Sequence, residues 1–275
     1  MKTALVTGAT DGIGKATAKK LLLEGWKVVI LGRNPNKCEA TLSELKRISN
    51  EVSAIVCDLS ILKDVIKAVD TFLSENTNLH LLLLNANAIA NKRIITKEGN
   101  EQNFAVGYLS RALMIKRLQD ILGKTENAQI LSVVGMDYSR INFEDLTMVE
   151  EFTGRKGLTR WQWAMNVYTR EFNERNPILL NLYMPGLVKT KILANEPQPM
   201  RTFVKLLNMI VGISVEKSAE NIYSVINEIT NNHKRGTCYA WRKERSFPKV
   251  EMKEGDQKKL WQVTDKILGP FILAN

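Results

Sequence analysis

The stretch Thr7-Gly-Ala-Thr-Asp-Gly-Ile-Gly14 decides the fold of this 275-residue chain. The apolar run 3–7 that leads into it predicts a short buried strand. The segment 15–25 that follows has apolar residues at helical spacing and predicts a helix. Residues 27–31 then predict a second strand, so the chain opens with one strand-helix-strand unit whose turn is rich in glycine.

Glycine at these positions lets bare backbone amides approach a pyrophosphate, and the N-terminus of the following helix favours negative charge. A glycine pattern alone is weak evidence, but a position between a strand and a helix is the context that supports nucleotide binding. An ordinary glycine turn is the alternative. We expect contacts to a dinucleotide from Gly8, Thr10, Asp11, Gly12, Ile13 and Gly14.

Further motifs follow in order along nearly the whole chain, and together they resemble the short-chain dehydrogenase/reductase family. Asp58-Leu-Ser60 is similar to the family's adenine contact. Asn85-Ala-Asn87 is similar to its Asn-Ala-Gly strand end, with Asn87 where a left-handed backbone suits asparagine. Pro185-Gly-Leu-Val-Lys-Thr190 is similar to the segment that closes over the nicotinamide. The resemblance implies nucleotide contacts from Asp58, Leu59, Asn85, Ala86, Pro185, Gly186, Val188 and Thr190.

Other segments resemble the retinol-dehydrogenase-like branch of this family, in particular its dehydrogenase/reductase family member 12 group. These segments are Asn91-Lys-Arg93, Gly99, Asn103-Phe104, Ile141–Leu146 and Lys259–Leu268.

The end of the second expected strand indicates which nucleotide is preferred. An acidic side chain there would bind a free ribose 2′-hydroxyl and repel a 2′-phosphate. This chain has Leu31-Gly-Arg-Asn34 instead, and the guanidinium of Arg33 can form paired charge-assisted bonds to a phosphate. NADP(H) is therefore favoured over NAD(H), and the alternative is that Arg33 is an ordinary solvated arginine.

The resemblance also implies catalytic positions, and this chain differs at each of them. The family uses a tyrosine acid and a lysine four residues later that lowers the pKa of that tyrosine. Alignment of Thr169-Arg-Glu-Phe172 with the Thr-Arg-Glu-Leu stretch of relatives places Leu158 at the tyrosine and Gln162 at the lysine. The family's asparagine, which supports a water relay, aligns with Gly107.

The serine that holds the substrate carbonyl in the family aligns with Gly135. A shift of the loop by two or three residues would place Val133 or Ser132 there instead. A tyrosine needs a nearby ammonium to exchange protons near neutrality, because its ordinary pKa is near 10. We therefore predict that ordinary carbonyl reduction is lost. Substitute proton donors could come from Tyr138, Lys156, Tyr183 and the pair of Asp137 and Arg140.

Two functional hypotheses follow. In the first, the chain binds NADP(H) as a folding ligand and acts as a structural or regulatory subunit of a larger assembly. In the second, it is an NADP(H)-dependent oxidoreductase of a lipophilic carbonyl or alcohol with a displaced proton donor. An empty nucleotide site is a further alternative. Trp161 and Trp163 lie on the helix face of the family's Tyr and Lys, where they would fill a vacated pocket or dock onto another chain.

Length and a hydrophobic content of 44% indicate one globular domain over residues 1–275. Its fold class is α/β, with a single Rossmann-type doubly wound parallel sheet and helices on both faces. Residues 190–215 are expected to form a lid-like insertion. Residues 236–275 are expected to form a closing strand, loop and helix, with Trp241 and Trp261 as core anchors. The expected strands lie at about 3–7, 27–31, 52–57, 80–84, 129–134 and 178–183.

The net charge of +10 implies a protein partner in an assembly or another acidic surface. Nucleic acid is not expected, because the sequence has no base-reading module. The apolar neighbourhood 200–213 contains Arg201, Lys205 and Asn208, so it is too interrupted to span a bilayer.

Three cysteines, Cys38, Cys57 and Cys238, have neither disulfide nor metal-ligand spacing, which fits an intracellular reducing compartment. Met1 leads almost directly into the first strand, so we expect no cleavable targeting peptide. A cytoplasmic or mitochondrial location is expected.

Overall fold

The computed structural model describes residues 1–189, 212–234 and 236–272. Parallel strands form the centre of the molecule, and the last strand runs antiparallel to its neighbour. The strands are β1 (Thr3–Thr7), β2 (Lys27–Gly32), β3 (Val52–Val56), β4 (Leu81–Leu84), β5 (Gln129–Val133), β6 (Leu179–Met184), β7 (Cys238–Ala240) and β8 (Lys243–Arg245). Their order in the single sheet is β3-β2-β1-β4-β5-β6-β7-β8, so the predicted doubly wound fold class is confirmed.

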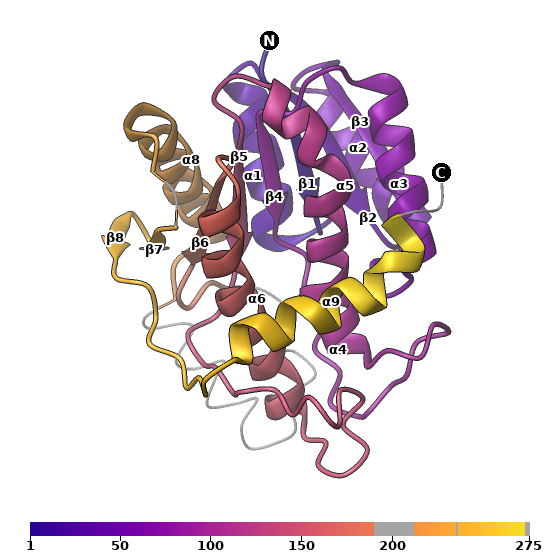
Figure 1. Ribbon diagram of the computed structural model, residues 1–275. Coiled ribbons are helices and arrows are strands. Elements are labelled where there is room, and N and C mark those ends of the chain that lie inside the picture. The colour runs from indigo at the N-terminus through magenta and orange to yellow at the C-terminus, as the bar shows by residue number, and fades with distance from the viewer. Residues whose placement is uncertain (190–211, 235, 273–275) are drawn as a thin grey trace.

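Helices cover both faces of this sheet (Figure 1). The helical elements are α1 (Gly12–Leu23), α2 (Pro35–Lys46), α3 (Leu62–Glu75), α4 (Gln102–Phe104), the π-helical turn η1 (Ala105–Leu109), α5 (Ser110–Lys124), α6 (Gly154–Arg175), α8 (Val215–Asn232) and α9 (Asp256–Ile272).

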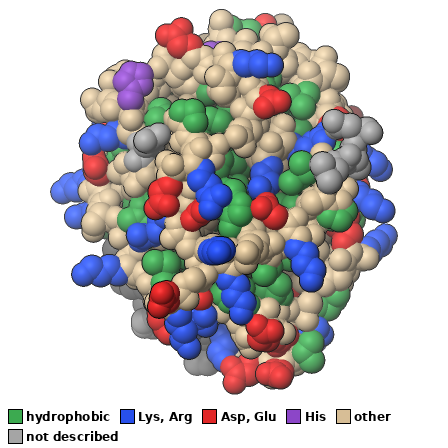
Figure 2. Space-filling view, viewed as in Figure 1, with side chains coloured by type: hydrophobic (Ala, Val, Ile, Leu, Met, Phe, Trp, Pro, Cys, Tyr) green, Lys and Arg blue, Asp and Glu red, His purple; other side chains and the backbone are tan. Residues whose placement is uncertain are grey.

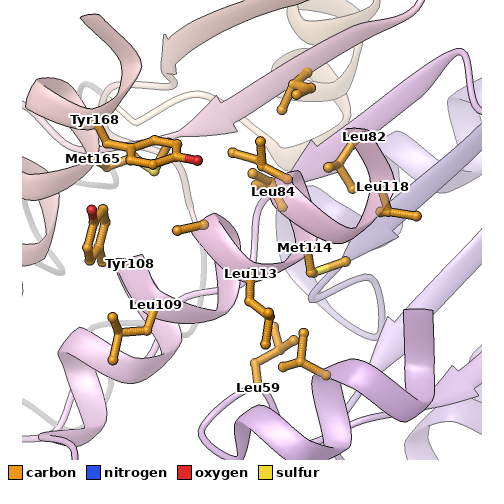
Figure 3. Close-up of a cluster of buried hydrophobic side chains, with 14 of the residues drawn as sticks. Leu59, Leu82, Leu84, Tyr108, Leu109, Leu113, Met114, Leu118, Met165 and Tyr168 are labelled. Atoms are coloured by element: carbon orange, nitrogen blue, oxygen red, sulfur yellow. The ribbon is translucent and has the colours of Figure 1, made fainter. Parts of the chain in front are cut away.

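Alternate residues of each strand point into two separate cores, because side chains of a strand alternate between its faces. In β1, Ala4 and Val6 pack under α1 and α8, whereas Leu5 packs on the opposite side. That opposite core lies between the sheet and helices α3, α5 and α6, and Figure 3 shows its side chains around Leu84 and Leu113. The sheet is therefore buried on both faces.

Helix α9 packs across α6, α5 and α3 and covers their outer side (Figure 1). Leu260 and Leu268 are buried beneath it, and the ring of Trp261 stacks on Tyr168 with centroids 5.3 Å apart. Trp261 thus acts as the expected anchor, although it is only half-buried. Among the described residues, no helix combines the length and apolar character needed to cross a membrane.

The C-terminal part of the chain differs from expectation in two respects. The strand β8 was not predicted, because Lys243, Glu244 and Arg245 are all charged and show no apolar alternation. Trp241 is not a core anchor as predicted. Its side chain is 48% exposed and its backbone is left-handed, with φ +54°. Most of the predicted lid, residues 190–211, lies outside the described part of the chain.

Candidate functional site

The nucleotide-binding residues predicted from the sequence gather at one edge of the sheet. They follow the carboxyl ends of β1, β2, β3, β4 and β6, which are neighbours or near neighbours in the sheet. In open α/β sheets ligands bind at this edge, where the strand order reverses. Thr190, also predicted as a contact, lies outside the described residues.

The glycine loop connects β1 to α1 and is shaped by close backbone contacts. Gly8 and Gly12 have φ of +65° and +54°, values that side-chain-bearing residues rarely adopt. A Cβ on Gly14 would lie under 3.0 Å from the Gly8 carbonyl and the Asn85 amide. Asp11 caps the helix by accepting from Gly12 N at 2.8 Å. The start of α1 lies at this edge of the sheet, and a helix N-terminus favours negative charge.

The remaining loop residues pack inward or against β2. Thr10 lies against Gly32, where an added Cβ would meet its Cγ2. Ile13 packs against the core under α1. Asn85 holds the loop in place, because its Nδ2 donates to the carbonyls of Thr7 and Gly8 at 3.1 and 3.3 Å.

Arg33 follows β2 and is exposed beside the glycine loop. No carboxylate in the described part of the chain pairs with it. Its neighbour Asn34 caps α2 by accepting from Lys37 N at 3.0 Å. The guanidinium is thus available to an anion at this end of the edge.

After β3, Asp58 accepts from both Ser60 N and Ser60 Oγ, at 2.9 and 2.8 Å. Leu59 is buried in the core, so only its backbone can reach a ligand. After β4, Ala86 abuts the glycine loop, because a Cβ on Gly8 would meet its Cα under 3.0 Å. The left-handed backbone expected for Asn87 is wrong, since its φ is not positive.

After β6, the chain turns through Pro185 and Gly186, which has φ +71°. The indole of Trp241 lies against Gly186, where an added Cβ would meet Nε1 of Trp241 at 2.5 Å. Val188 is buried and forms a parallel bridge with Ile213. The exposed Trp241 therefore packs on the Pro-Gly turn instead of entering the core.

Beside η1, a side chain of α6 fills the space next to a glycine. Trp161 is 1% exposed and covers Gly107 in the π-helical turn η1. A Cβ on Gly107 would lie under 3.0 Å from three atoms of the Trp161 ring. An asparagine side chain and this indole cannot occupy the same space. The indole of Trp161 thus occupies the space that a side chain at position 107 would need.

Gln162 likewise fills the space next to Gly135. A Cβ on Gly135 would lie under 3.0 Å from Oε1 of Gln162. Gln162 is buried, and its Nε2 donates to the Leu158 carbonyl at 3.3 Å. Gly135 and Gln162 are therefore in direct contact, and a side chain at position 135 would need the space of this amide. The alternative Ser132 lies within β5 and is fully buried.

Arg111 on α5 was missed in the sequence, although a basic residue before Ala112-Leu-Met-Ile115 is an unusual feature of a buried helix. It is 2% exposed. Its Nη1 donates to Ser132 Oγ and the Val133 carbonyl, and its Nη2 donates to the Ala86 carbonyl, all at 2.7 Å. The guanidinium also stacks on the Trp161 ring, 4.7 Å from the centroid. Burial lowers the pKa of Arg111 to about 9, so it remains charged at neutral pH.

The suggested substitute donors are engaged elsewhere. Tyr138 donates to the Gly135 carbonyl at 2.9 Å, and burial raises its pKa. Lys156 pairs with Glu151 on the surface. Tyr183 is buried among residues that pack under α8. Their hydroxyl and ammonium groups do not converge on one point.

The expected pair of Asp137 and Arg140 does not form. Asp137 pairs with Arg155, whereas Arg140 makes two bonds of 2.6 Å to Asp256 at the start of α9. Arg140 bonds to Asp256 and not to Asp137, because the C-terminal segment packs beside the loop that carries Arg140.

Trp163 is also buried, and its Nε1 donates to the Glu251 carbonyl at 2.6 Å. Both Trp161 and Trp163 are therefore covered by their own chain, and their docking onto another chain is contradicted. The three cysteines are buried and unpaired. No group of ligands able to hold a metal ion occurs among the described residues.

Comparison with known proteins agrees with this architecture. The family model described as short chain dehydrogenase matches residues 2–201. Human polyprenol dehydrogenase is 26% identical over 82% of this chain and 72% of its own length. Human retinol dehydrogenase 14 is 27% identical over 98% of this chain and 86% of its own length.

Solved structures show the same fold. An alcohol dehydrogenase from the archaeon Thermococcus sibiricus, complexed with 5-hydroxy-NADP, superposes with a TM-score of 0.67. It is 21% identical and covers 92% of this chain and 100% of its own. A short chain dehydrogenase/reductase from Burkholderia phymatum, in complex with NAD, has a TM-score of 0.66 and 20% identity, covering 87% and 88%. From its fold and the matched residues, the chain belongs to the short chain dehydrogenase family.

Proposed function

We propose that this protein binds NADP(H), has lost carbonyl reduction, and serves as a structural or regulatory subunit of a larger assembly. The observation that carries the proposal is the reciprocal packing of α6 against two glycines. Trp161 fills the space above Gly107, and Gln162 fills the space beside Gly135.

The glycine loop supports nucleotide binding. Its backbone amides and the start of α1 would hold the pyrophosphate, because a helix N-terminus favours negative charge. Arg33 would hold the 2′-phosphate that distinguishes NADP(H) from NAD(H). The known structures that share the fold include complexes with both kinds of nucleotide, so Arg33 is the basis for the choice. When bound, NADP(H) supplies a hydride donor or acceptor.

The four residues aligned with the family's catalytic positions cannot donate or accept a proton. Leu158 is apolar, and the amide of Gln162 does not titrate near neutrality. Gly107 and Gly135 have no side chains, and the space beside them is already filled. Hydride transfer to a carbonyl needs a proton partner, so reduction by this route is blocked.

A nucleotide that is bound and not consumed acts as a folding ligand, because it binds the folded chain alone. The charge of +10 supports an acidic partner. On the face that carries α9, however, basic and acidic side chains are interspersed (Figure 2). Pairs such as Lys116 with Asp265 and Lys259 with Glu144 account for part of this mixture. The partner is therefore expected to dock elsewhere.

The test is a titration of NADPH, and separately NADH, into the purified protein. Nicotinamide fluorescence and the melting temperature are followed, and a carbonyl panel is then added. We expect a rise in melting temperature with NADPH, a smaller rise with NADH, and no oxidation of NADPH. A ligand at 100 times its Kd stabilises by about 2.7 kcal/mol. Turnover of any carbonyl would contradict the proposed loss of chemistry.

The second candidate function is an oxidoreductase for a lipophilic carbonyl or alcohol. Tyr138 favours it, because its hydroxyl lies 2.9 Å from the Gly135 carbonyl, beside the position aligned with the family's serine. Two relatives are named for dehydrogenation of polyprenol and retinol. The raised pKa of Tyr138 makes it a poorer proton exchanger than a tyrosine beside a lysine. Turnover that disappears in Tyr138→Phe would establish this function.

A further inference from the structure

Arg111 is a buried cation at the edge of the sheet where the nucleotide would bind. Its three acceptors are the Ala86 carbonyl after β4, and Ser132 Oγ and the Val133 carbonyl at the end of β5. Its Nε has no hydrogen-bond partner in the described part of the chain. Neutral dipoles therefore surround a full positive charge.

The position of Arg111 along this edge is defined by the strand order. Arg33 follows β2, so the 2′-phosphate half of the dinucleotide would lie over β2 and β3. A dinucleotide spans the point where the strand order reverses, and its other half lies over the strands beyond β1. These are β4, β5 and β6, and Arg111 binds the ends of the first two.

No described carboxylate offsets the charge of Arg111, since its hydrogen bonds go to two carbonyls and one hydroxyl. The nearby Gln162, aligned with the family's lysine, is neutral. The chain thus places a fixed cation on α5, below Trp161, where the stack on the indole holds the guanidinium. Charges in such a dry environment act over longer distances than they do in water.

Nicotinamide differs in charge between its two redox forms: the oxidised ring is cationic and the reduced ring is neutral. We propose that Arg111 makes this site select NADPH over NADP+. The inference rests on the proposed binding of NADP(H), and it identifies the reduced form as the resident ligand. The two redox forms share the same adenine half and phosphates, so their difference in affinity reports the environment of the ring alone.

The experiment measures Kd for NADPH by nicotinamide fluorescence and Kd for NADP+ by displacement of NADPH. For the unmodified protein we expect NADPH to bind roughly tenfold more tightly, which corresponds to two like charges about 12 Å apart at an effective dielectric of about 20. In Arg111→Met the ratio should fall toward one. In Arg111→Lys, which keeps the charge, much of the ratio should remain.

Arg33→Met is the matched control. It removes a cation from the adenine half, so it should weaken NADPH and NADP+ equally and leave their ratio unchanged. If Arg111→Met does not fold, Arg111→Gln takes its place, because it removes the charge but keeps an amide donor for the same carbonyls, and its ratio should likewise fall toward one. Equal affinities in the unmodified protein, or an unchanged ratio in Arg111→Met, would overturn this inference alone. Failure to bind either nucleotide would overturn the proposed function as well.

Discussion

The glycine loop after β1 and the region between β5 and α6 lie at the same edge of the sheet, and both depend on glycine for different reasons. In the loop, Gly8 and Gly12 have positive φ, so glycine is needed for the shape of the backbone. Gly107 and Gly135 have no positive φ, and glycine is needed there because α6 takes the space. Glycine thus sets the backbone conformation of the first region, whereas in the second it leaves space that other side chains of the chain fill.

The largest expected effect tests the filled region. Trp161→Ala should lower the free energy of unfolding by roughly 3–5 kcal/mol, because a fully buried indole is removed. Gly107→Ala should also destabilise the protein, since its Cβ meets the indole. In the Trp161→Ala background, however, Gly107→Ala should be neutral or stabilising, as alanine favours a helix and fills part of the cavity.

Urea denaturation of the four proteins measures this cycle. A coupling energy below about 0.5 kcal/mol would show that Trp161 and Gly107 are independent, against the reciprocal packing.

The next effect tests the glycine loop. Gly14→Ala should weaken NADPH binding by about 100-fold, equivalent to roughly 2.7 kcal/mol, because the loop must move away from the added Cβ. Isothermal calorimetry measures the loss. The control is Gly123→Ala in α5, where a Cβ meets nothing within 4 Å. That control should bind NADPH normally and gain up to about 1 kcal/mol in stability. Normal binding by Gly14→Ala would mean that the loop does not hold the nucleotide.

A smaller effect concerns the ion pair that joins Arg140 to Asp256 at the start of α9. The Arg140 guanidinium holds the pKa of Asp256 below its usual value. A carboxylate whose pKa is lower in the folded than in the unfolded protein stabilises the fold at pH values above its unfolded-state pKa. This stabilisation is lost as the pH falls through the folded-state pKa. Asp256→Asn should therefore cost about 2 kcal/mol at pH 7 and less at pH 3, which lies below the ordinary pKa of an aspartate. Urea melts at both pH values measure the difference. If the loss of unfolding free energy in Asp256→Asn were the same at both pH values, the effect would come from packing and not from the ion pair.

The smallest effect sharpens the nucleotide assignment. Arg33→Met should weaken NADPH binding about tenfold and leave NADH binding unchanged, because the 2′-phosphate alone distinguishes the two. Fluorescence titrations with both nucleotides measure the ratio. An equal loss for both would show that Arg33 contacts a part they share.

The sequence predicted the sheet because local patterns determine it. Each of the first six strands is a mainly apolar segment, and all six lie within a few residues of expectation. The strand β8 has no such pattern. Its three charged residues pair with β7 because the preceding turn at Trp241 and Arg242 returns the chain alongside it.

The candidate site was predictable where a motif carries its own backbone geometry, as in the glycine loop. Arg111 was not, because its partners Ala86, in the loop after β4, and Ser132, in β5, share no spacing with it in the sequence. Trp161 is buried by its own chain, which was one of the two roles predicted for it, but its contact with Gly107 depends on how α6 packs against η1. Such non-local complementarity leaves no periodic signal in one sequence.

Helix α9 also bears on the order in which this protein can form. The core beneath it joins Leu5 of the first strand with Leu260 and Leu268 near the end of the described chain. Synthesis delivers the N-terminal strands first, at about 5–20 residues per second. For several seconds after α5 and α6 have left the ribosome, therefore, their outer sides are not yet covered by α9. During that interval Tyr168 and its apolar neighbours are open to chaperones, and maturation is complete only after α9 docks.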